Sequence, residues 1–270
     1  MRALRRVSGA AGLVLTVVAV QLALSAGVGA AVRAGVGAAM GEWTILADGH
    51  LIYGVFELLV EHPGQLAAAR QLLAGSAVLA LAVWTLLAAG ILRRLDGPAP
   101  AAEVAAAAVR SFPGVLVVSL WHLIPRAVLL AAAGALTARL LRAEAWGLLG
   151  LALTVAVAGY ANCALDLSRA AVVLHGAPRF HPRTALRGFL RAARRPGVLL
   201  PSMLLSAGQW LALAAIVAVA VAGLGTPWAI WLARALAILG VVLGLTRMAV
   251  AVEAGPERDA PGPATADGGP

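Results

Sequence analysis

The chain has few charged residues. Of its 270 residues only 12% are Asp, Glu, Lys or Arg and 61% are hydrophobic, whereas about 25% of the residues of a soluble domain are charged. A soluble globular domain is therefore excluded. Lysine is absent, so arginine is the only basic residue besides histidine. Together with the abundant Ala, Gly, Leu and Val, this composition is typical of a GC-rich bacterial genome.

Cysteine is almost absent as well. The single thiol, Cys163, lies within an apolar run, which excludes an internal disulfide and a metal site built from several cysteines. The chain also lacks an H-E-x-x-H pattern and a discernible nucleophile–base–orienter arrangement. The sequence therefore predicts no catalytic residue, no cofactor and no metal site, and we expect the protein not to be an enzyme.

What the sequence does contain is a series of apolar runs. Each reaches roughly 20 residues, enough to cross a hydrocarbon core about 30 Å thick, and none alternates in the manner of barrel strands. We therefore predict an all-α integral membrane protein with a single polytopic domain over residues 1–252 and a disordered cytoplasmic tail over 253–270. The predicted transmembrane helices, about six in number, cover residues 7–31, 66–92, 112–136, 146–174, 198–222 and 228–252.

The first of these helices has an alternative interpretation as a signal peptide. Arginines precede its apolar run, and "VGA" before Ala31 resembles a cleavage site. The apolar region runs from Val7 to about Ala26, longer than the usual stretch of about 7–15 residues in signal peptides. This length favours an uncleaved helix, and cleavage stays open.

The arginines between the runs predict the orientation, because cytoplasmic loops carry an excess of positive charge. With the N-terminus inside, the inner side receives Arg2, Arg5, Arg6, Arg93, Arg94, Arg110, Arg179, Arg183, Arg187, Arg191, Arg194, Arg195 and Arg258. The outer side keeps Arg33, Arg70, Arg139 and Arg142. We expect a multi-pass protein of the bacterial inner membrane with both termini cytoplasmic. The formal charge of +9 therefore indicates topology, and we expect no nucleic-acid partner.

The most basic loop, "HPRTALRGFLRAARRPG", follows the fourth predicted helix. Pro182 suits the first turn of a helix and Pro196-Gly197 suits its end. One face of this helix would carry Arg183, Arg187, Arg191 and Arg194, and the other Leu186, Phe189, Leu190 and Ala193. The pattern predicts a basic amphipathic helix on the cytoplasmic leaflet, whose four arginines contact anionic lipid headgroups. A plain loop that marks the inner side is the alternative.

Four polar residues inside the spans form a candidate cluster. His122 and Arg126 lie one turn apart in the third predicted helix, and Asp166 and Arg169 lie three residues apart in the fourth. Residues three apart share a helix face, so we expect Asp166 to pair with Arg169. Such a pair fixes helix packing or serves an ion or proton relay. Arg169 is also placed to snorkel towards the inner headgroups.

The segment between the first two spans carries a polar stripe. His50, Glu57 and Glu61 recur on one face of an otherwise apolar stretch, which predicts an outer amphipathic helix. The stripe has three interpretations: a solvated face, an ion-pair partner for Arg126, or a divalent-metal site.

A family resemblance rests on two elements. The first is the D-x-x-R element at Asp166 and Arg169, followed by a small-polar loop and "ALRGFLRAARRPG" over residues 185–197. The second is "VWTLLAAGILRRLDG" over residues 83–97. Together they resemble a loose group of bacterial six-helix proteins, which includes the membrane domain attached to some glycerophosphodiester phosphodiesterases. The resemblance covers roughly residues 66–252. It implies the six-helix fold, and because no soluble phosphodiesterase domain is present it does not imply hydrolysis.

Two functions fit these features. We expect first a non-enzymatic scaffold or accessory membrane component. The alternative is a transporter or permease for a small or lipid-like solute, with His122, Arg126 and the acids as its polar path. Matching halves with broken helices, a common transporter feature, are not visible. A water-accessible cavity that reaches Arg126 would favour transport, and a solidly packed bundle would favour the scaffold.

Overall fold

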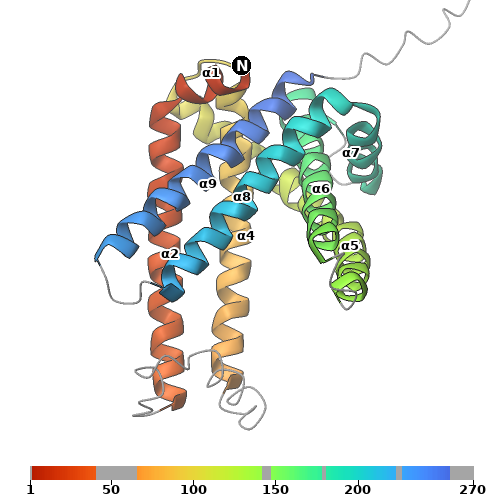
Figure 1. The fold of residues 1–270 in the computed structure, drawn as a ribbon. Helices are drawn as coiled ribbons and strands as arrows, with labels where there is room; N and C mark the ends of the chain where they lie inside the picture. The colour runs from red at the N-terminus through yellow and green to blue at the C-terminus, as the bar shows by residue number, and fades with distance from the viewer. Residues whose placement is uncertain (1, 41–65, 142–146, 178–180, 223–226, 256–270) are drawn as a thin grey trace, which may run out of the picture.

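The chain forms a bundle of long helices. The computed structural model describes residues 2–40, 66–141, 147–177, 181–222 and 227–255, and the regular structure within these ranges is helical. The helices are α1 (Arg2–Ser8), α2 (Ala11–Met40), α4 (Leu66–Asp96), α5 (Ala101–Leu141), α6 (Gly147–His175), α7 (Pro182–Arg194), α8 (Pro196–Ala222) and α9 (Pro227–Glu253) (Figure 1). Five contain a stretch long and apolar enough to cross a membrane, and the number is six if the bent pair formed by α1 and α2 is counted as one span. The predicted all-helical multi-pass fold is confirmed.

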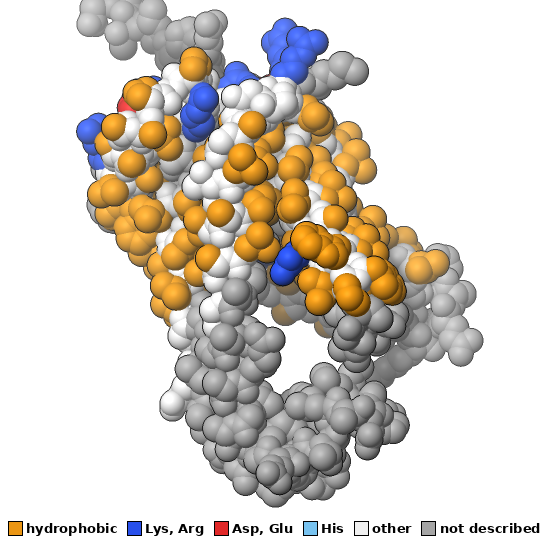
Figure 2. All heavy atoms as spheres, turned by 90° about the vertical axis from the view of Figure 1, so that its left-hand side faces the viewer, with side chains coloured by type: hydrophobic (Ala, Val, Ile, Leu, Met, Phe, Trp, Pro, Cys, Tyr) orange, Lys and Arg blue, Asp and Glu red, His pale blue; other side chains and the backbone are white. Residues whose placement is uncertain are grey.

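The outer surface of the bundle suits a lipid environment. Helices α8 and α9 lie side by side and cross α2 and α4, while α5 and α6 pack against each other and α7 lies on α6 (Figure 1). Large apolar side chains point outward, and Leu148, Leu204 and Leu211 expose 83%, 73% and 72% of their surface. Figure 2 shows hydrophobic side chains over most of the height of one face, with most of its basic side chains near the upper end. This distribution is the one expected of a membrane-spanning bundle.

Small residues set the distance between neighbouring helices. A Cβ added to Gly150 of α6 would lie 2.9 Å from the Cα of Thr137 in α5, and one added to Gly159 would lie 2.9 Å from the Cα of Met203 in α8. Any side chain at either glycine would push backbones apart. Close approach at small residues is the usual means of packing helices in membranes, where the hydrophobic effect between helices is weak.

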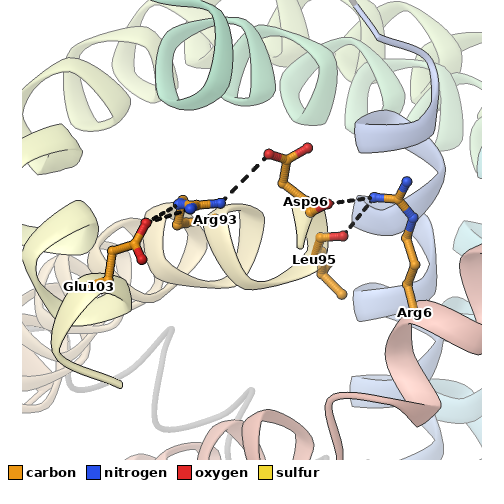
Figure 3. A network of polar contacts seen from close by, with 5 residues as sticks. All are labelled: Arg6, Arg93, Leu95, Asp96 and Glu103. Atoms are coloured by element: carbon orange, nitrogen blue, oxygen red, sulfur yellow. Dashed lines mark hydrogen bonds and ion pairs between the residues drawn. The ribbon is translucent and has the colours of Figure 1, made fainter. Parts of the chain in front are cut away.

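The first span differs from its prediction. In place of one straight helix beginning at Val7, α1 and α2 meet at 73°, and α1 lies across one end of the bundle (Figure 1). Arg6 of α1 donates to the backbone oxygens of Leu95 (2.7 Å) and Asp96 (3.3 Å) (Figure 3). Its Nε also lies 3.6 Å from a carboxylate oxygen of Glu253. The arginine thus satisfies free carbonyls at the C-terminus of α4, where a cation is also favoured by the helix dipole.

The third span begins earlier than predicted, at Ala101 in place of residue 112. The added turns are the stretch "AAEVAAAAVR", and alanine is the strongest helix former. Glu103 lies in the first turn of α5 and forms an ion pair with Arg93 of α4, which also lies 3.7 Å from Asp96 (Figure 3). These contacts tie the short connection between α4 and α5 to both helices.

A second arginine caps a helix at the same end of the bundle. The Nη1 of Arg195, at the junction of α7 and α8, donates to the backbone oxygens of Ala254 (2.7 Å) and Gly255 (3.3 Å) after α9. Gly255 has a positive φ of 60°, the left-handed conformation common after a helix C-terminus. The arginine-rich segments α1, the α4 end and the α7–α8 junction therefore gather at one end. That this end is cytoplasmic stays a prediction.

Candidate functional site

An ion pair between α6 and α9 forms the centre of the candidate site. Arg247 Nε donates to Asp166 Oδ2 at 2.7 Å, and the side chains of Asp166 and Arg247 are only 1% and 12% exposed. Arg247 Nη1 also donates to Ser206 Oγ (3.2 Å) and Gln209 Oε1 (2.7 Å) of α8. The pairing of Asp166 with Arg169 predicted from the sequence is therefore corrected, because the structure gives Asp166 a partner 81 residues further along the chain.

Gln209 is itself held in place. Its Nε2 donates to the carbonyl oxygen of Gly240 at 3.0 Å, and a Cβ added to Gly244 would lie 2.7 Å from this nitrogen. The two glycines, one turn apart on α9, thus leave room for the amide beside Arg247. Oxygens of Asp166, Ser206 and Gln209 surround the guanidinium of Arg247, which satisfies much of its hydrogen-bonding capacity.

Arg169 is also buried, but by a different contact. Its Nε and Nη2 both donate to Ser119 Oγ of α5, at 3.1 and 3.0 Å, and the residue is only 9% exposed. The expectation that Arg169 snorkels to the headgroups is wrong, because its guanidinium points into the α5–α6 interface. Both of these hydrogen bonds go to one neutral hydroxyl, and among the described residues Arg169 forms no ion pair with a carboxylate.

His122 joins α5, α6 and α7. Its Nε2 lies 2.9 Å from Ser168 Oγ, and its ring stacks on Phe189 of α7 at 4.8 Å between centroids. The Ser168 hydroxyl is also within 2.9 Å of the Ala164 carbonyl and 3.2 Å of the Thr184 carbonyl. Although serine and histidine are adjacent, Ser168 is 1% exposed and His122 2%. Both side chains are enclosed in this structure, where their contact joins α5, α6 and α7.

The basic loop forms the predicted helix, α7, but its buried face differs from the prediction. His181 accepts a hydrogen bond from the Arg183 backbone amide through Nδ1 (3.1 Å), and Pro182 occupies the first turn. The buried residues are Thr184, Ala185, Gly188, Phe189 and Ala192. Leu186 and Leu190, predicted on the apolar face with Phe189, are 60% and 48% exposed. A Cβ at Gly188 would lie 2.0 Å from Ser168 Oγ, so the close approach of α7 to α6 requires glycine at this position.

The outward surface of α7 is mixed in character. Arg183, Arg187 and Arg194 are exposed on the same helix as Leu186 and Leu190. Arg191, the fourth predicted headgroup contact, is partly buried. An exposed surface with both arginine and leucine side chains suits the boundary between lipid headgroups and acyl chains.

A cavity of about 410 Å³ opens beside the ion pair. It lies among α2, α4, α5, α6, α8 and α9, and the polar side chains that line it are Gln21, Arg126, Asn162, Arg169, Gln209 and Arg247. The remaining lining is largely apolar and includes Trp84, Leu213, Ile216 and Leu236. Leu213, on the α8 side of the cavity, is 49% exposed. The bundle is therefore not solidly packed at this position.

Of the three arginines that line this cavity, Arg126 has the fewest described polar contacts. It is partly buried and lines the cavity. Within the described ranges its guanidinium has no hydrogen-bond acceptor and no carboxylate partner. Placing an arginine at the centre of a span costs about 2.5–3.5 kcal/mol on insertion scales. The structure thus brings three arginines and one carboxylate, that of Asp166, to one polar region.

Two buried polar atoms in the same region lack partners. They are Asp166 Oδ1 and His122 Nδ1. Buried acceptors without a partner are uncommon in folded proteins. Asp166 Oδ2 accepts from Arg247, so its second oxygen is a carboxylate acceptor without a described partner.

Sequence reasoning missed Arg247 and Gln209, although a signal for Arg247 was present. A lone arginine in the last apolar run meets the same criterion that identified Arg126, namely an ionisable residue inside a span.

The predicted outer stripe of His50, Glu57 and Glu61 lies outside the described residues. In the part of the chain that the structure describes, no three His, Cys, Asp or Glu side chains are grouped as metal ligands.

Comparisons with known proteins add no family. No protein-family model matches the chain, and searches of curated proteins and of solved structures find no significant match. The resemblance to the membrane domain of glycerophosphodiester phosphodiesterases stays an expectation. The fold and the site together define the protein as a multi-pass helical membrane protein with a charged cavity between its helices.

Proposed function

We propose that this protein is a permease that carries a small or lipid-like solute, and that the cavity beside Asp166 and Arg247 holds the solute. The observation that carries this proposal is the cavity itself, which reaches Arg126 between helices that are otherwise apolar. A scaffold gains nothing from keeping several charged side chains around an open space inside a membrane. Solute sites of transporters typically lie at such positions between helices. We propose no catalytic role.

The composition of the cavity supports this function. Its volume is within the range of roughly 300–1,000 Å³ usual for small-molecule sites, which combine apolar walls with a few polar groups. A second cavity, about 550 Å³ between α2, α4 and α5, offers a contrast. Thr16 and Arg94 are the only polar side chains among the residues that line it. Of these two cavities, the first is the one that combines a suitable volume with several polar side chains.

Thiol labelling tests whether the cavity is reached by solutes. Because the chain has one cysteine, Cys163→Ala provides a cysteine-free background, in which Ala237→Cys places a thiol in the cavity lining. The matched control is Leu239→Cys, two residues further along α9 on the exposed apolar surface (47% exposed). A membrane-impermeant anionic methanethiosulfonate should label the cavity cysteine in vesicles, and the control should stay unlabelled. No labelling of Ala237→Cys from either side would refute the permease and leave the scaffold.

We further propose a bacterial inner-membrane location with both termini cytoplasmic. The arginine-rich end of the bundle formed by α1, the α4 end and the α7–α8 junction supports this orientation. In this arrangement α7 lies at the inner surface, and we propose that Arg183, Arg187 and Arg194 contact anionic headgroups there. Anionic membrane lipids are then the partners that the surface of the protein favours.

A further inference from the structure

The charges around the cavity do not balance. Arg126, Arg169 and Arg247 contribute three positive charges, and Asp166 contributes one negative charge. The carboxylate is already engaged by Arg247 at 2.7 Å. In the part of the chain that the structure describes, two positive charges therefore remain without a carboxylate. Uncompensated charges in a poorly solvated site favour the binding of a counterion.

The three arginines differ in how many donors remain available. Arg247 donates to three side chains, and Arg169 donates through two nitrogens to Ser119. Arg126 lines the cavity without a described acceptor. A guanidinium carries five N–H donors in a planar fork, which matches the two oxygens of a phosphate or carboxylate. Arg126 is thus the group with both the charge and the free donors to receive an oxyanion.

The apolar part of the cavity lining indicates that a ligand would also have an apolar portion. Leu213, Ile216 and Leu236 line it together with Trp84, and Leu213 is 49% exposed. An alkyl chain attached to a headgroup at Arg126 could contact these residues within the same cavity. A fully hydrated ion would gain nothing from this apolar wall. The lining combines a guanidinium, which suits an anion, with apolar side chains, which suit hydrocarbon.

We propose that the cavity binds an amphiphilic oxyanion, with a phosphate or carboxylate headgroup at Arg126 and an alkyl chain along Leu213, Ile216 and Leu236. This inference rests on the proposed permease function for its biological meaning, but the binding itself is testable without transport. The headgroup chemistry is shared by membrane lipids and by free phosphate. The test separates these two sources.

The experiment uses the purified full-length protein in dodecyl maltoside, a neutral detergent. Calorimetric titration and thermal unfolding are measured with dodecyl phosphate, dodecyltrimethylammonium and inorganic phosphate. Dodecyl phosphate should bind and raise the unfolding temperature, and the cation should do neither. Inorganic phosphate should bind at least about tenfold more weakly than dodecyl phosphate, because it buries no apolar surface. Equal binding of inorganic phosphate would overturn the amphiphile, and equal binding of the cation would overturn the oxyanion.

Variants assign the headgroup to its residue. Arg126→Gln should raise the Kd for dodecyl phosphate by about tenfold or more, the size of losing a charge-assisted hydrogen bond, and Arg126→Lys should keep part of the affinity. The matched control is Arg234→Gln: Arg234 lies in the last span, over Trp231 at 5.2 Å, and does not line the cavity. It should bind as the native protein does. Unchanged affinity in Arg126→Gln would overturn the assignment. If that variant does not fold, Arg126→Lys is measured in its place, and an affinity equal to that of the native protein would overturn the assignment.

The outcomes for binding and for transport are independent. If dodecyl phosphate binds and Ala237→Cys is not labelled, the ligand class stands and the permease fails. If Ala237→Cys is labelled and dodecyl phosphate does not bind, the cavity is open to water and the proposed ligand class is wrong.

Discussion

Removing the Asp166 carboxylate is the most direct test of the polar centre. In the native protein Asp166 Oδ2 accepts from Arg247 Nε at 2.7 Å, with 1% of the Asp166 side chain exposed. Asp166→Ala leaves the Arg247 charge between α6 and α9 without its counterion. Breaking a buried ion pair in this way costs about 3–5 kcal/mol. Arg247 keeps its contacts to Ser206 and Gln209, so we expect the lower end, about 3 kcal/mol.

Two double variants identify the true partner. Asp166→Ala with Arg247→Met removes both charges and should recover much of the lost stability, because a buried ion pair can often be replaced by apolar groups at little net cost. Asp166→Ala with Arg169→Met should recover little, since Arg169 has its own acceptor in Ser119 and Arg247 stays stranded. The two variants therefore separate the pair seen in the structure from the pair that sequence spacing suggests.

Equilibrium unfolding of the purified protein in mixed micelles, with SDS as the denaturant, measures these differences. Coupling between Asp166 and Arg247 should exceed the average of about 0.6 kcal/mol found for polar contacts between membrane helices. Recovery by Arg169→Met as large as that by Arg247→Met would refute the geometry. Unchanged stability of Asp166→Ala together with altered solute binding would show that the carboxylate serves function and not packing.

Three further predictions concern α7 and the topology. Gly188→Ala should destabilise the protein by about 1–3 kcal/mol, because the added Cβ would lie 2.0 Å from Ser168 Oγ and 2.5 Å from the Ala164 backbone oxygen. The control in the same unfolding assay is Gly197→Ala, whose Cβ would have no atom within 4 Å. Reporter fusions after residues 92 and 174 should report the cytoplasm, and a fusion within 139–144 the outer side. Replacing Arg183, Arg187 and Arg194 of α7 by Gln should reduce binding of phosphatidylglycerol measured by native mass spectrometry, and salt should weaken the native binding.

Each of these has a clear contradicting result. Equal stability of the two glycine variants would mean that α7 does not pack closely on α6. An outer signal from the fusion after residue 174 would reverse the orientation. Equal binding of phosphatidylcholine and phosphatidylglycerol by the native protein would limit the α7 arginines to a topology signal.

The spans were predictable because hydropathy over a long window depends on composition and not on neighbours. The predicted ranges 146–174, 198–222 and 228–252 correspond to Gly147–His175, Pro196–Ala222 and Pro227–Glu253 in the structure. Errors arose where a helix continues into polar sequence. The alanine-rich turns before residue 112 are too mixed to register as apolar, yet alanine forms helix wherever nothing interrupts it.

The partners inside the bundle could not be predicted in the same way. Spacing shows which residues share a helix face, but not how that face is rotated toward its neighbours. Asp166 and Arg169 share a face and still have different partners, Arg247 of α9 and Ser119 of α5. The buried face of α7 was missed for a related reason. Hydrophobicity favours Leu186 and Leu190 for burial, whereas the contact with α6 selects the small residues that permit a close approach.

Among the cavity arginines, we expect Arg247 to contribute to the stability of the protein and Arg126 to contribute to ligand binding. Arg247 is held by a carboxylate, a hydroxyl and an amide from α6 and α8, so its positive charge contributes to the packing of three helices. Arg126 has no such described contacts and faces the open space. A positive charge in a span without a structural partner lowers the stability of the protein. An anionic ligand that binds there neutralises this charge and thereby stabilises the protein. Substitutions at Arg247 should therefore lower stability whether or not a ligand is present, whereas substitutions at Arg126 should change stability chiefly when the ligand is present.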